Sequence, residues 1–195
     1  MAQRLALRLF LASVAAAELM ADYLGMRLGL YESLARDGSA TAEELAQRAG
    51  IATRYAREWL EQQSASGILA VDSVDKEPHE RVYALPVGHA DVFTNLDSPY
   101  SIAPFAVLPA AGIARTLPLL LEAYRTGRGV PGDRYDEDWQ AGQASFNRAT
   151  FRNQLPGWLR DGLPDIHARL SSGGRVADVA CGTGWSTLAI AQTYE

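Results

Sequence analysis

The sequence predicts a mainly α-helical chain with one small β-hairpin, followed by the first βα unit of a Rossmann-like α/β domain that is truncated. Apolar residues recur at helical spacing through most of residues 4–170. Two short apolar runs on either side of a polar stretch predict the hairpin. The run RVADVACGTGWS (residues 175–186) has the pattern of a short strand, a glycine turn and a helix start. Because such a unit normally begins an α/β domain, we expect the rest of that domain to lie outside these 195 residues.

The composition is that of a globular protein with an acidic balance. Hydrophobic residues make up 48% of the chain and charged residues 21%, which is ordinary for a globular domain. The net charge of −5 argues against a broad nucleic-acid-binding surface, because such surfaces carry a basic excess. The single cysteine, Cys181, excludes an intrachain disulfide. With no disulfide framework and no clear export signal, we expect a cytoplasmic location.

The first expected helix covers residues 4–24. Arg8, Glu18 and Asp22 interrupt its apolar run, so we expect it to be too short and too charged to span a membrane. A signal peptide is the alternative interpretation, but apolar residues three or four apart share one helical face, which favours an amphipathic helix. We expect this face to be core or the seam of a homodimer. It consists of Leu5, Leu9, Ala12, Ala16, Leu19 and Tyr23.

Capping signals predict the next two helices. The segment LYESLA (residues 30–35) predicts a short helix that stops before a glycine. Thr41 is followed three residues later by Glu44, a capping box that starts a helix over residues 42–49. Gly50 then supplies the left-handed residue that ends it.

A third helix and a hairpin complete this part of the chain. We expect Thr53 to cap a helix over residues 54–66, which Gly67 ends. Residues 68–71 and 81–85 are short strands, and the polar stretch between them is the hairpin loop. Helices around a sharp corner followed by a hairpin are the order of a winged helix. Its expected small core consists of Leu45, Ala46, Ala49, Ile51, Leu60, Ile68 and Leu69.

From residue 86 onward the pattern changes. Residues 89–101 are polar and irregular, with turn residues throughout. Residues 104–127 contain a helical run in which Pro118 kinks the helix or starts a new segment. Residues 128–138 form a loop. Helices are expected over residues 139–155 and 158–170, with Pro164 as a break in the second.

The pattern predicts no metal site. The three histidines lie far apart in the sequence. An acidic cluster near residue 135 lacks the alternating spacing of a calcium loop, so we expect a solvated loop there. The cluster consists of Asp133, Asp136, Glu137 and Asp138.

The glycine turn is the strongest functional signal. Residues 176–180 are expected to form a strand buried on both faces. The small residues that follow let a backbone approach a ligand closely. The helix beyond them, residues 187–193, offers free N–H groups and a positive dipole end that stabilise a carboxylate or phosphate. A dinucleotide fingerprint would place its third glycine where this chain has Trp185.

The pattern D-x-A-x-G-x-G resembles the first motif of class I S-adenosylmethionine-dependent methyltransferases. The resemblance implies that the cofactor is S-adenosyl-L-methionine (SAM), with the turn beneath its methionine end. Asp178 would be the acidic residue, and Ala180, Gly182 and Gly184 the small positions, of which Ala180 departs from the family's glycine. The family's ribose-binding acid and adenine pocket would lie beyond Glu195.

Two longer segments resemble one branch of small-molecule methyltransferases, in which an N-terminal domain forms a homodimer interface and a lid over the substrate. They are TAEELAQRAGIATRYAREWLEQQSASGIL and LPDIHARLSSGGRVADVACGTGWS. The resemblance divides the chain into a winged-helix-like domain (1–86), a helical connector or lid (87–172) and the start of the SAM-binding domain (173–195). It implies direct displacement at the sulfonium methyl group by a small-molecule acceptor, without a metal. Catalytic residues stay unassigned, and we expect the fragment alone to be inactive.

Residues in the helix before the motif are candidates for a pocket, because this region covers cofactor and substrate in the resembling family. They are Trp139, Phe146 and Asn147. Ordinary helix packing is the alternative role for them.

Two other functions compete with an enzyme: a winged-helix transcriptional regulator and a non-enzymatic dimerisation module. The helix over residues 54–66 would read DNA, but its two arginines are matched by two glutamates. The expected wing has more acidic than basic residues, and phosphate binding needs a cation excess. We therefore do not expect nucleic-acid binding.

Overall fold

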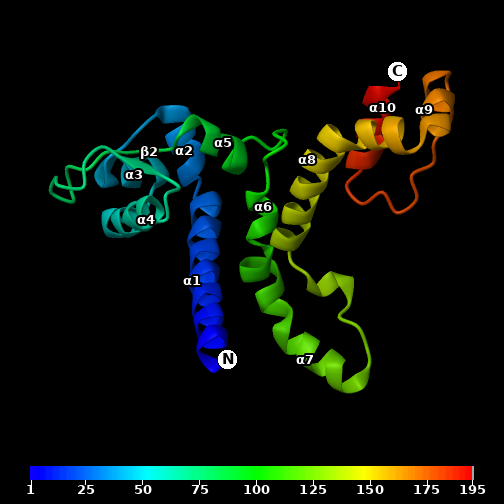
Figure 1. The fold of residues 1–195 in the computed structure, drawn as a ribbon. Helices are drawn as coiled ribbons and strands as arrows, with labels where there is room; N and C mark the ends of the chain where they lie inside the picture. The colour runs from blue at the N-terminus through cyan, green and yellow to red at the C-terminus, as the bar shows by residue number, and fades with distance from the viewer. Residues whose placement is uncertain (195) are drawn as a thin grey trace.

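The computed structural model describes residues 1–194, which are mainly helical (Figure 1). The one sheet within these residues has two antiparallel strands. The elements are α1 (Ala2–Arg27), α2 (Leu30–Asp37), α3 (Ala42–Ala49), α4 (Thr53–Ala65), β1 (Ala70–Val71), β2 (Tyr83–Ala84), α5 (Val87–Phe93), α6 (Ala103–Ala106), α7 (Leu117–Thr126), α8 (Glu137–Gly162), α9 (Pro164–Ser171) and α10 (Trp185–Thr193). The predicted three-part division of the chain stays a prediction, and its last residue, Glu195, lies outside the described residues.

The capping signals act as the sequence predicts, with one exception. The Thr41 hydroxyl accepts from the Glu44 amide at 3.3 Å, and the Glu44 carboxylate accepts from the Thr41 amide at 2.8 Å. Gly50 ends α3 with a φ of +66°. The expected cap at Thr53 is wrong: Ala52 precedes the helix, and no side chain caps it. Ala52 already has the extended backbone of an N-cap residue, so the helix starts one residue early.

The hairpin forms with shorter strands than expected. Ala70 pairs with Ala84, and Val71 with Tyr83. Tyr83 also exchanges two backbone hydrogen bonds of 2.9 Å with Ala40. This isolated antiparallel β-bridge lies beside the hairpin. The polar loop between the strands is fixed at Asp72, whose carboxylate accepts from the amide of Val82 at 3.0 Å.

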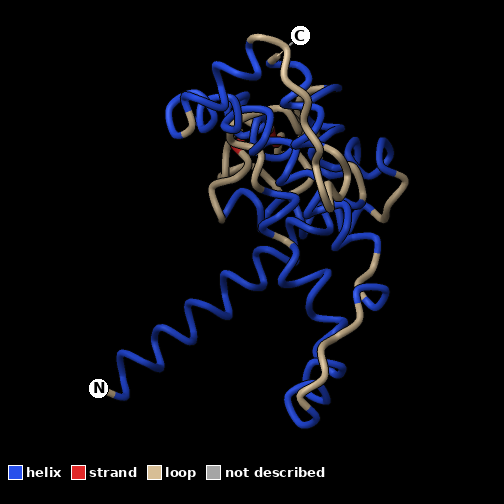
Figure 2. Tube along the Cα trace, turned by 90° about the vertical axis from the view of Figure 1, so that its right-hand side faces the viewer, coloured by secondary structure: helices blue, strands red, loops and turns tan. Residues whose placement is uncertain are grey.

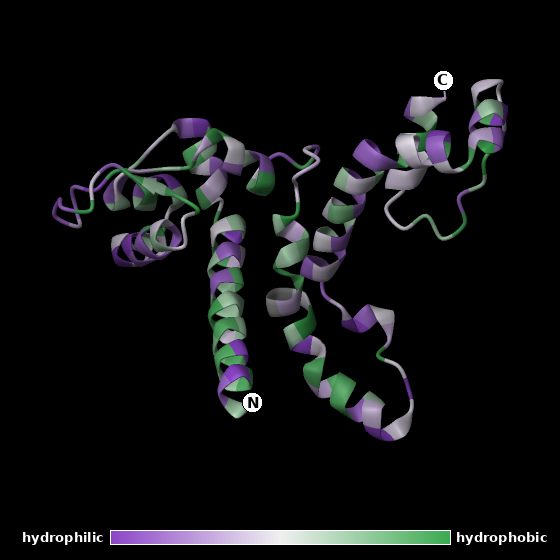
Figure 3. Ribbon diagram, in the orientation of Figure 1, coloured by the Kyte–Doolittle hydropathy of each residue, from purple (hydrophilic) through white to green (hydrophobic). Residues whose placement is uncertain are grey.

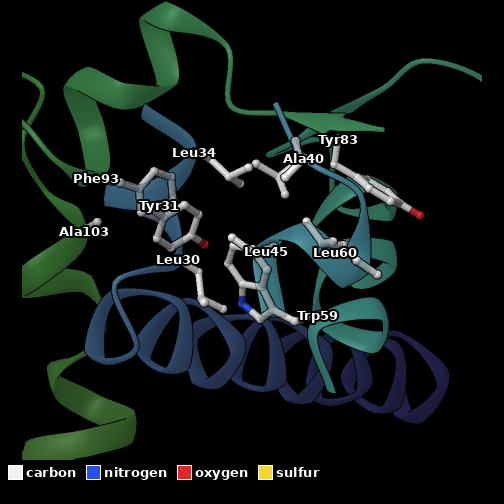
Figure 4. Packing of buried hydrophobic residues seen from close by; sticks show 12 residues of the cluster. Leu30, Tyr31, Leu34, Ala40, Leu45, Trp59, Leu60, Tyr83, Phe93 and Ala103 are labelled. Atoms are coloured by element: carbon white, nitrogen blue, oxygen red, sulfur yellow. The ribbon is translucent and has the colours of Figure 1, made fainter. Parts of the chain in front are cut away.

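The core lies where α2, α3, α4 and the hairpin meet (Figure 4). Four predicted core residues are buried, and the other three pack against them. The aromatic centre was not predicted: Tyr31 stacks on Phe93 at 4.1 Å and meets the edge of Trp59 at 5.0 Å. The buried members of the predicted set are Leu45, Ala46, Leu60 and Leu69.

A buried polar ring joins α1 to this core. The Tyr31 hydroxyl lies 2.5 Å from Gln63 Oε1 and 3.0 Å from Asp22 Oδ1, while Gln63 Nε2 donates to Asp22 at 3.0 Å. A hydroxyl has one hydrogen to give, so both of its contacts are hydrogen bonds at the same time only when Asp22 is protonated. Burial raises the pKa of Asp22, which favours that protonated form.

The first half of α1 extends away from the body (Figure 2). Residues 1–17 are all exposed, and apolar side chains cover much of the helix (Figure 3). The predicted apolar face is therefore core only at its C-terminal end, where Leu19 and Tyr23 are half-buried. Among the described residues, no helix has the length and apolarity needed to cross a membrane.

Residues 89–101 are not wholly irregular as expected, because α5 occupies their start. Pro86 begins this helix, and Phe93 is buried against Tyr31, so tertiary packing compensates for the weak local pattern. Beyond it, α6 continues through a π-helical turn (Pro109–Ile113) and a 3-10 turn (Ala114–Thr116) into α7. Pro118 is among the first residues of α7 and starts a new segment, one of the two predicted roles.

The two helices expected after residue 138 are joined differently. α8 runs continuously through Pro156, where the sequence predicted a gap. Pro156 has no backbone N–H, so the carbonyl of Arg152 loses its partner in the helix. Arg152 is exposed, so water can bind this carbonyl and the helix continues. The expected break at Pro164 is confirmed, because α8 ends at Gly162 and Pro164 starts α9.

The strand expected over residues 176–180 does not form. Val176 and Val179 are 50% and 89% exposed, and the segment has no neighbouring strand among the described residues to accept its backbone hydrogen bonds. The helix after the glycine turn does form, from Trp185 rather than from residue 187.

Candidate functional site

The turn between residues 180 and 184 has an unusual backbone. Ala180, Gly182 and Gly184 have φ values of +60°, +58° and +81°. Ala180 is the only non-glycine residue with positive φ among the described residues, so its backbone is in a conformation that L-residues rarely adopt. A Cβ atom added at Gly182 or Gly184 would meet no other atom within 4 Å. The turn therefore presents open backbone to its surroundings.

Asp178 fixes this turn to the helix that follows. Its Oδ2 atom accepts from the Ser186 hydroxyl at 2.6 Å and from the Thr187 hydroxyl at 2.7 Å. These two hydrogen bonds lower the pKa of Asp178, because they stabilise the carboxylate. The roles of Ser186 and Thr187 were not predicted, although hydroxyl residues in the first turn of a helix are a readable signal.

The first turn of α10 is suited to a ligand with negative charge. Gly184 is the N-cap residue, and its own amide donates to the Cys181 carbonyl at 2.9 Å. The first amides of a helix have no partner within the helix, and they carry its positive dipole end. The site thus combines an open glycine backbone, the N-terminal end of a helix and a fixed carboxylate, which also accepts from the Thr187 amide.

A residue on α8 connects this turn to the N-terminal part of the chain. The Arg148 guanidinium lies over the Trp185 ring, 4.7 Å from its centroid. The same guanidinium donates to both carboxylate oxygens of Asp97, at 2.7 and 2.8 Å. Asn153 adds a hydrogen bond to the Asp97 carbonyl at 3.0 Å. The sequence offered no signal for this contact, because Asp97 and Arg148 are 51 residues apart.

The three pocket candidates all lie on α8 and each packs against a neighbour. Trp139 lies beside Tyr135, with ring centroids 5.1 Å apart. Phe146 stacks on Phe105 at 4.5 Å. Asn147 accepts from the Gln143 amide at 3.2 Å. Their role in a substrate pocket stays a prediction.

The acidic residues before α8 are not all solvated as expected. Asp136 caps the helix by accepting from the Trp139 amide at 3.0 Å. Asp138 accepts from the Tyr23 hydroxyl at 2.6 Å and lies 3.4 Å from Arg27. The expected solvated loop is wrong for these two, because Arg115 and the start of α8 supply the partners of Asp136, and α1 supplies those of Asp138. Within residues 1–194, no three acidic, histidine or cysteine side chains are grouped as metal ligands would be.

Three basic residues of α4 and the wing are paired with carboxylates, whereas Arg57 on α4 has no ion pair among the described residues. Arg54 lies 3.8 Å from Glu58 on the same helix. Arg81 lies 3.7 Å from Glu61, and Lys76 lies 2.6 Å from Asp72. These pairs leave little of the cation excess that a DNA-binding surface needs.

Residues 15–95 match a family model described as the Rv2258c-like winged HTH domain. The match covers α2 to α5, the hairpin and the second half of α1, and it confirms the winged-helix prediction. No curated protein matches the chain.

Solved structures of methyltransferases share the fold of nearly the whole chain. Human N-acetylserotonin methyltransferase, crystallised with SAM, aligns with a TM-score of 0.61 at 17% identity, over 97% of this chain and 56% of that one. A riboflavin-derivative dimethyltransferase, RosA from Streptomyces davawensis, gives 0.57 at 19% identity, over 96% and 55%. The mitomycin 7-O-methyltransferase MmcR gives 0.54 at 18% identity, over 99% and 57%. The chain thus spans little more than half the length of these neighbours.

Proposed function

We propose that this chain is the N-terminal portion of a SAM-dependent methyltransferase that acts on a small molecule. The observation that carries the proposal is the turn in which Ala180, Gly182 and Gly184 all have positive φ directly before α10. The winged-helix domain that precedes this turn, and the fold shared with methyltransferases, support the same conclusion.

The residues at the turn fit the cofactor. Gly182 and Gly184 leave room for close approach of its methionine end, and the amides at the start of α10 would receive its carboxylate. When bound, SAM supplies a methyl group on a positively charged sulfur. Asp178 acts as a positioning residue, because its hydrogen bonds to Ser186 and Thr187 hold the turn against the helix. Rate enhancement in such a transfer comes mainly from holding the reactants in line.

We further propose that residues 1–195 alone bind the cofactor weakly and do not catalyse methyl transfer. The exposed Val176 and Val179 support this, because the segment before the turn has no sheet around it within the described residues. Isothermal titration calorimetry with SAM tests the point, and micromolar affinity of this chain would refute it.

The gene beyond codon 195 tests the enzyme itself. An open frame that encodes a second apolar strand ending in Asp or Glu, about 20 residues after the turn by analogy with nucleotide-binding folds, supports the proposal. The longer product should then convert SAM to S-adenosylhomocysteine in the presence of an acceptor. A stop codon at that position, with no cofactor binding by the chain, would contradict the proposal.

The winged-helix domain is proposed to serve as a homodimer module. Leu5, Leu9, Phe10 and Val14 are 49–64% exposed on the projecting half of α1, and exposed apolar surface of this kind marks interfaces. Sedimentation velocity at micromolar concentration should show a dimer, and Phe10→Glu should dissociate it while Gln3→Glu does not. A wild-type monomer would contradict the module. A salt-dependent shift of duplex DNA would instead favour the transcriptional regulator, although the pairing of Arg54 with Glu58 on α4 argues against it.

A further inference from the structure

A cavity lies away from the glycine turn, between the winged-helix domain and the first half of α8. It has a volume of about 250 Å³ and is lined by residues of α1, α2, α5, α6 and α8. On α8 its lining runs from Asp138 to Ser145, whereas the contact with Trp185 begins further along, at Arg148. The cavity is therefore separate from the proposed cofactor site.

The inner end of this cavity is apolar and closely packed. Phe93, Val107 and Leu108 line it and are at most 9% exposed. Gly142 lets α8 approach here, because a Cβ at this position would lie 2.4 Å from a Leu108 methyl group and 2.6 Å from the Pro104 carbonyl oxygen. An apolar cavity of about 150 Å³ holds benzene. The larger volume in this chain suits a molecule with one or two rings.

The outer end of the cavity carries charge. Asp138 is already engaged by the Tyr23 hydroxyl and by Arg27, so this group of three residues is balanced internally. Glu32, exposed on the first turn of α2, lines the same cavity and forms no ion pair or side-chain hydrogen bond with another residue among residues 1–194. The rim therefore has one unmatched negative charge beside an apolar interior. Partial burial also raises the pKa of Glu32, as expected for a carboxylate that lacks a cation.

We propose that this cavity binds a small amine with an apolar body, its rings against Phe93 and Leu108 and its ammonium group beside Glu32. The ring system fills the volume that the aromatic and aliphatic side chains leave open. The ammonium stays at the rim, where it keeps part of its water and meets the unmatched carboxylate. The inference goes beyond the proposed function, because it requires neither SAM nor methyl transfer.

Three indoles that differ only in charge test the proposal on the full 195-residue chain. Tryptamine is cationic, indole is neutral and indole-3-acetate is anionic. A titration followed by amide chemical shifts in nuclear magnetic resonance gives each dissociation constant and places the ligand. Tryptamine should bind about fivefold more tightly than indole, the upper range for a partly exposed ion pair, and indole-3-acetate should bind least. The shifts should centre on Phe93, Leu108 and Gly142.

Two variants separate the charge from the cavity. Glu32→Gln should reduce tryptamine binding to the level of indole, while Glu43→Gln, on the first turn of α3, should leave it unchanged. Ala141→Phe places a ring in the cavity and should abolish binding of all three compounds, with Gln140→Phe as its control. If Ala141→Phe does not fold, Ser145→Leu fills the same space. Binding of none of the indoles, an equal affinity for all three, or full binding by the filled variant would overturn the proposal.

Discussion

In the winged-helix domain, Leu45 and Leu60 are completely buried, whereas beside the glycine turn Val179 is 89% exposed. Both regions carry clear apolar patterns in the sequence. The two regions differ in the packing partners available to them. α2, α3, α4 and the hairpin enclose one core, while residues 176–180 are joined to α10 through Asp178 and have no sheet beside them among the described residues. A helix satisfies its own backbone, so it forms in either setting, and a strand forms only beside another strand.

The two regions also differ in the pKa shift of one aspartate in each, because the two shifts have opposite directions. Burial raises the pKa of Asp22 in the polar ring of the winged-helix domain. Hydrogen bonds from Ser186 and Thr187 lower the pKa of Asp178 at the turn. The first carboxyl is favoured when protonated and the second when ionised. The two regions should therefore respond to pH with opposite signs.

The largest contrast is expected from deleting apolar groups in the two regions. Leu60→Ala should lower the free energy of unfolding by about 2–5 kcal/mol, because it removes buried contacts and leaves a cavity. Val179→Ala should change it by less than about 0.5 kcal/mol, since the side chain is exposed. Urea unfolding followed by circular dichroism measures both. A similar cost for the two would mean that residue 179 is buried in solution.

A smaller effect should follow from the charge on Asp22. Because the folded-state pKa lies above the unfolded value of 3.8, its contribution to stability is present below that value and is lost as pH rises through the folded pKa. Asp22→Asn has no carboxyl to ionise at this position, so it should not lose this stability. The free energy of unfolding of the variant, relative to that of the wild type, should therefore increase with pH from about 4 upward. Asp75→Asn, on the exposed wing, serves as the control. If the difference in free energy of unfolding between wild type and Asp22→Asn does not change with pH, the raised pKa of Asp22 is contradicted.

The ion pair between Arg148 and Asp97, which joins the two regions, should contribute less to the free energy of unfolding. Arg148→Met and Asp97→Asn should each cost little, and a double-mutant cycle should give a coupling energy of about 0.5–1 kcal/mol, as for other partly exposed pairs. Arg148→Met should also change the fluorescence of Trp185, whose ring it covers. Arg160→Met is the matched control, because among the described residues Arg160 forms its one ion pair with the adjacent Asp161. Additive single effects would show that the contact is not formed in solution.

The smallest effect is local to the turn. Asp178→Asn should leave global stability unchanged and increase hydrogen exchange of the amides of residues 184–187. In the wild type, protection of these amides should be present above the unfolded pKa of 3.8 and fall as pH drops through the lower folded pKa. The asparagine variant should show no such fall. Equal protection in both proteins at neutral pH would mean that Ser186 and Thr187 do not need the carboxylate.

The sequence predicted features that depend on near neighbours. Thr41 and Glu44 form their capping box within one helical turn, and Gly50 and Gly67 end helices by their own backbone freedom. The core positions of α3 and α4 follow from periodicity, as Leu45 and Leu60 illustrate. The winged-helix order was readable because each of its elements has a local signal.

Features that depend on distant partners were missed or wrong. The stack of Tyr31 on Phe93 needs α5, which the irregular composition of its segment concealed. The contact between Arg148 and Asp97 joins two separate segments of the chain, so no local sequence pattern relates the two residues. At the candidate site, the motif located the turn and its three small residues, but not the hydroxyls that hold Asp178 or the arginine over Trp185.

The length of α8 has a mechanical consequence. Its first turn is anchored to α1 through Asp138, and its far part carries α9 and α10. Up to Pro156, the helix is a rod of 19 residues (137–155) and roughly 29 Å at about 1.5 Å each, so a tilt of about 5° at the anchored end moves the other end by about 2.5 Å. The rod acts as a lever arm. Small rotations at Asp138 are thereby magnified into displacements of the helices at its far end that are as long as a hydrogen bond.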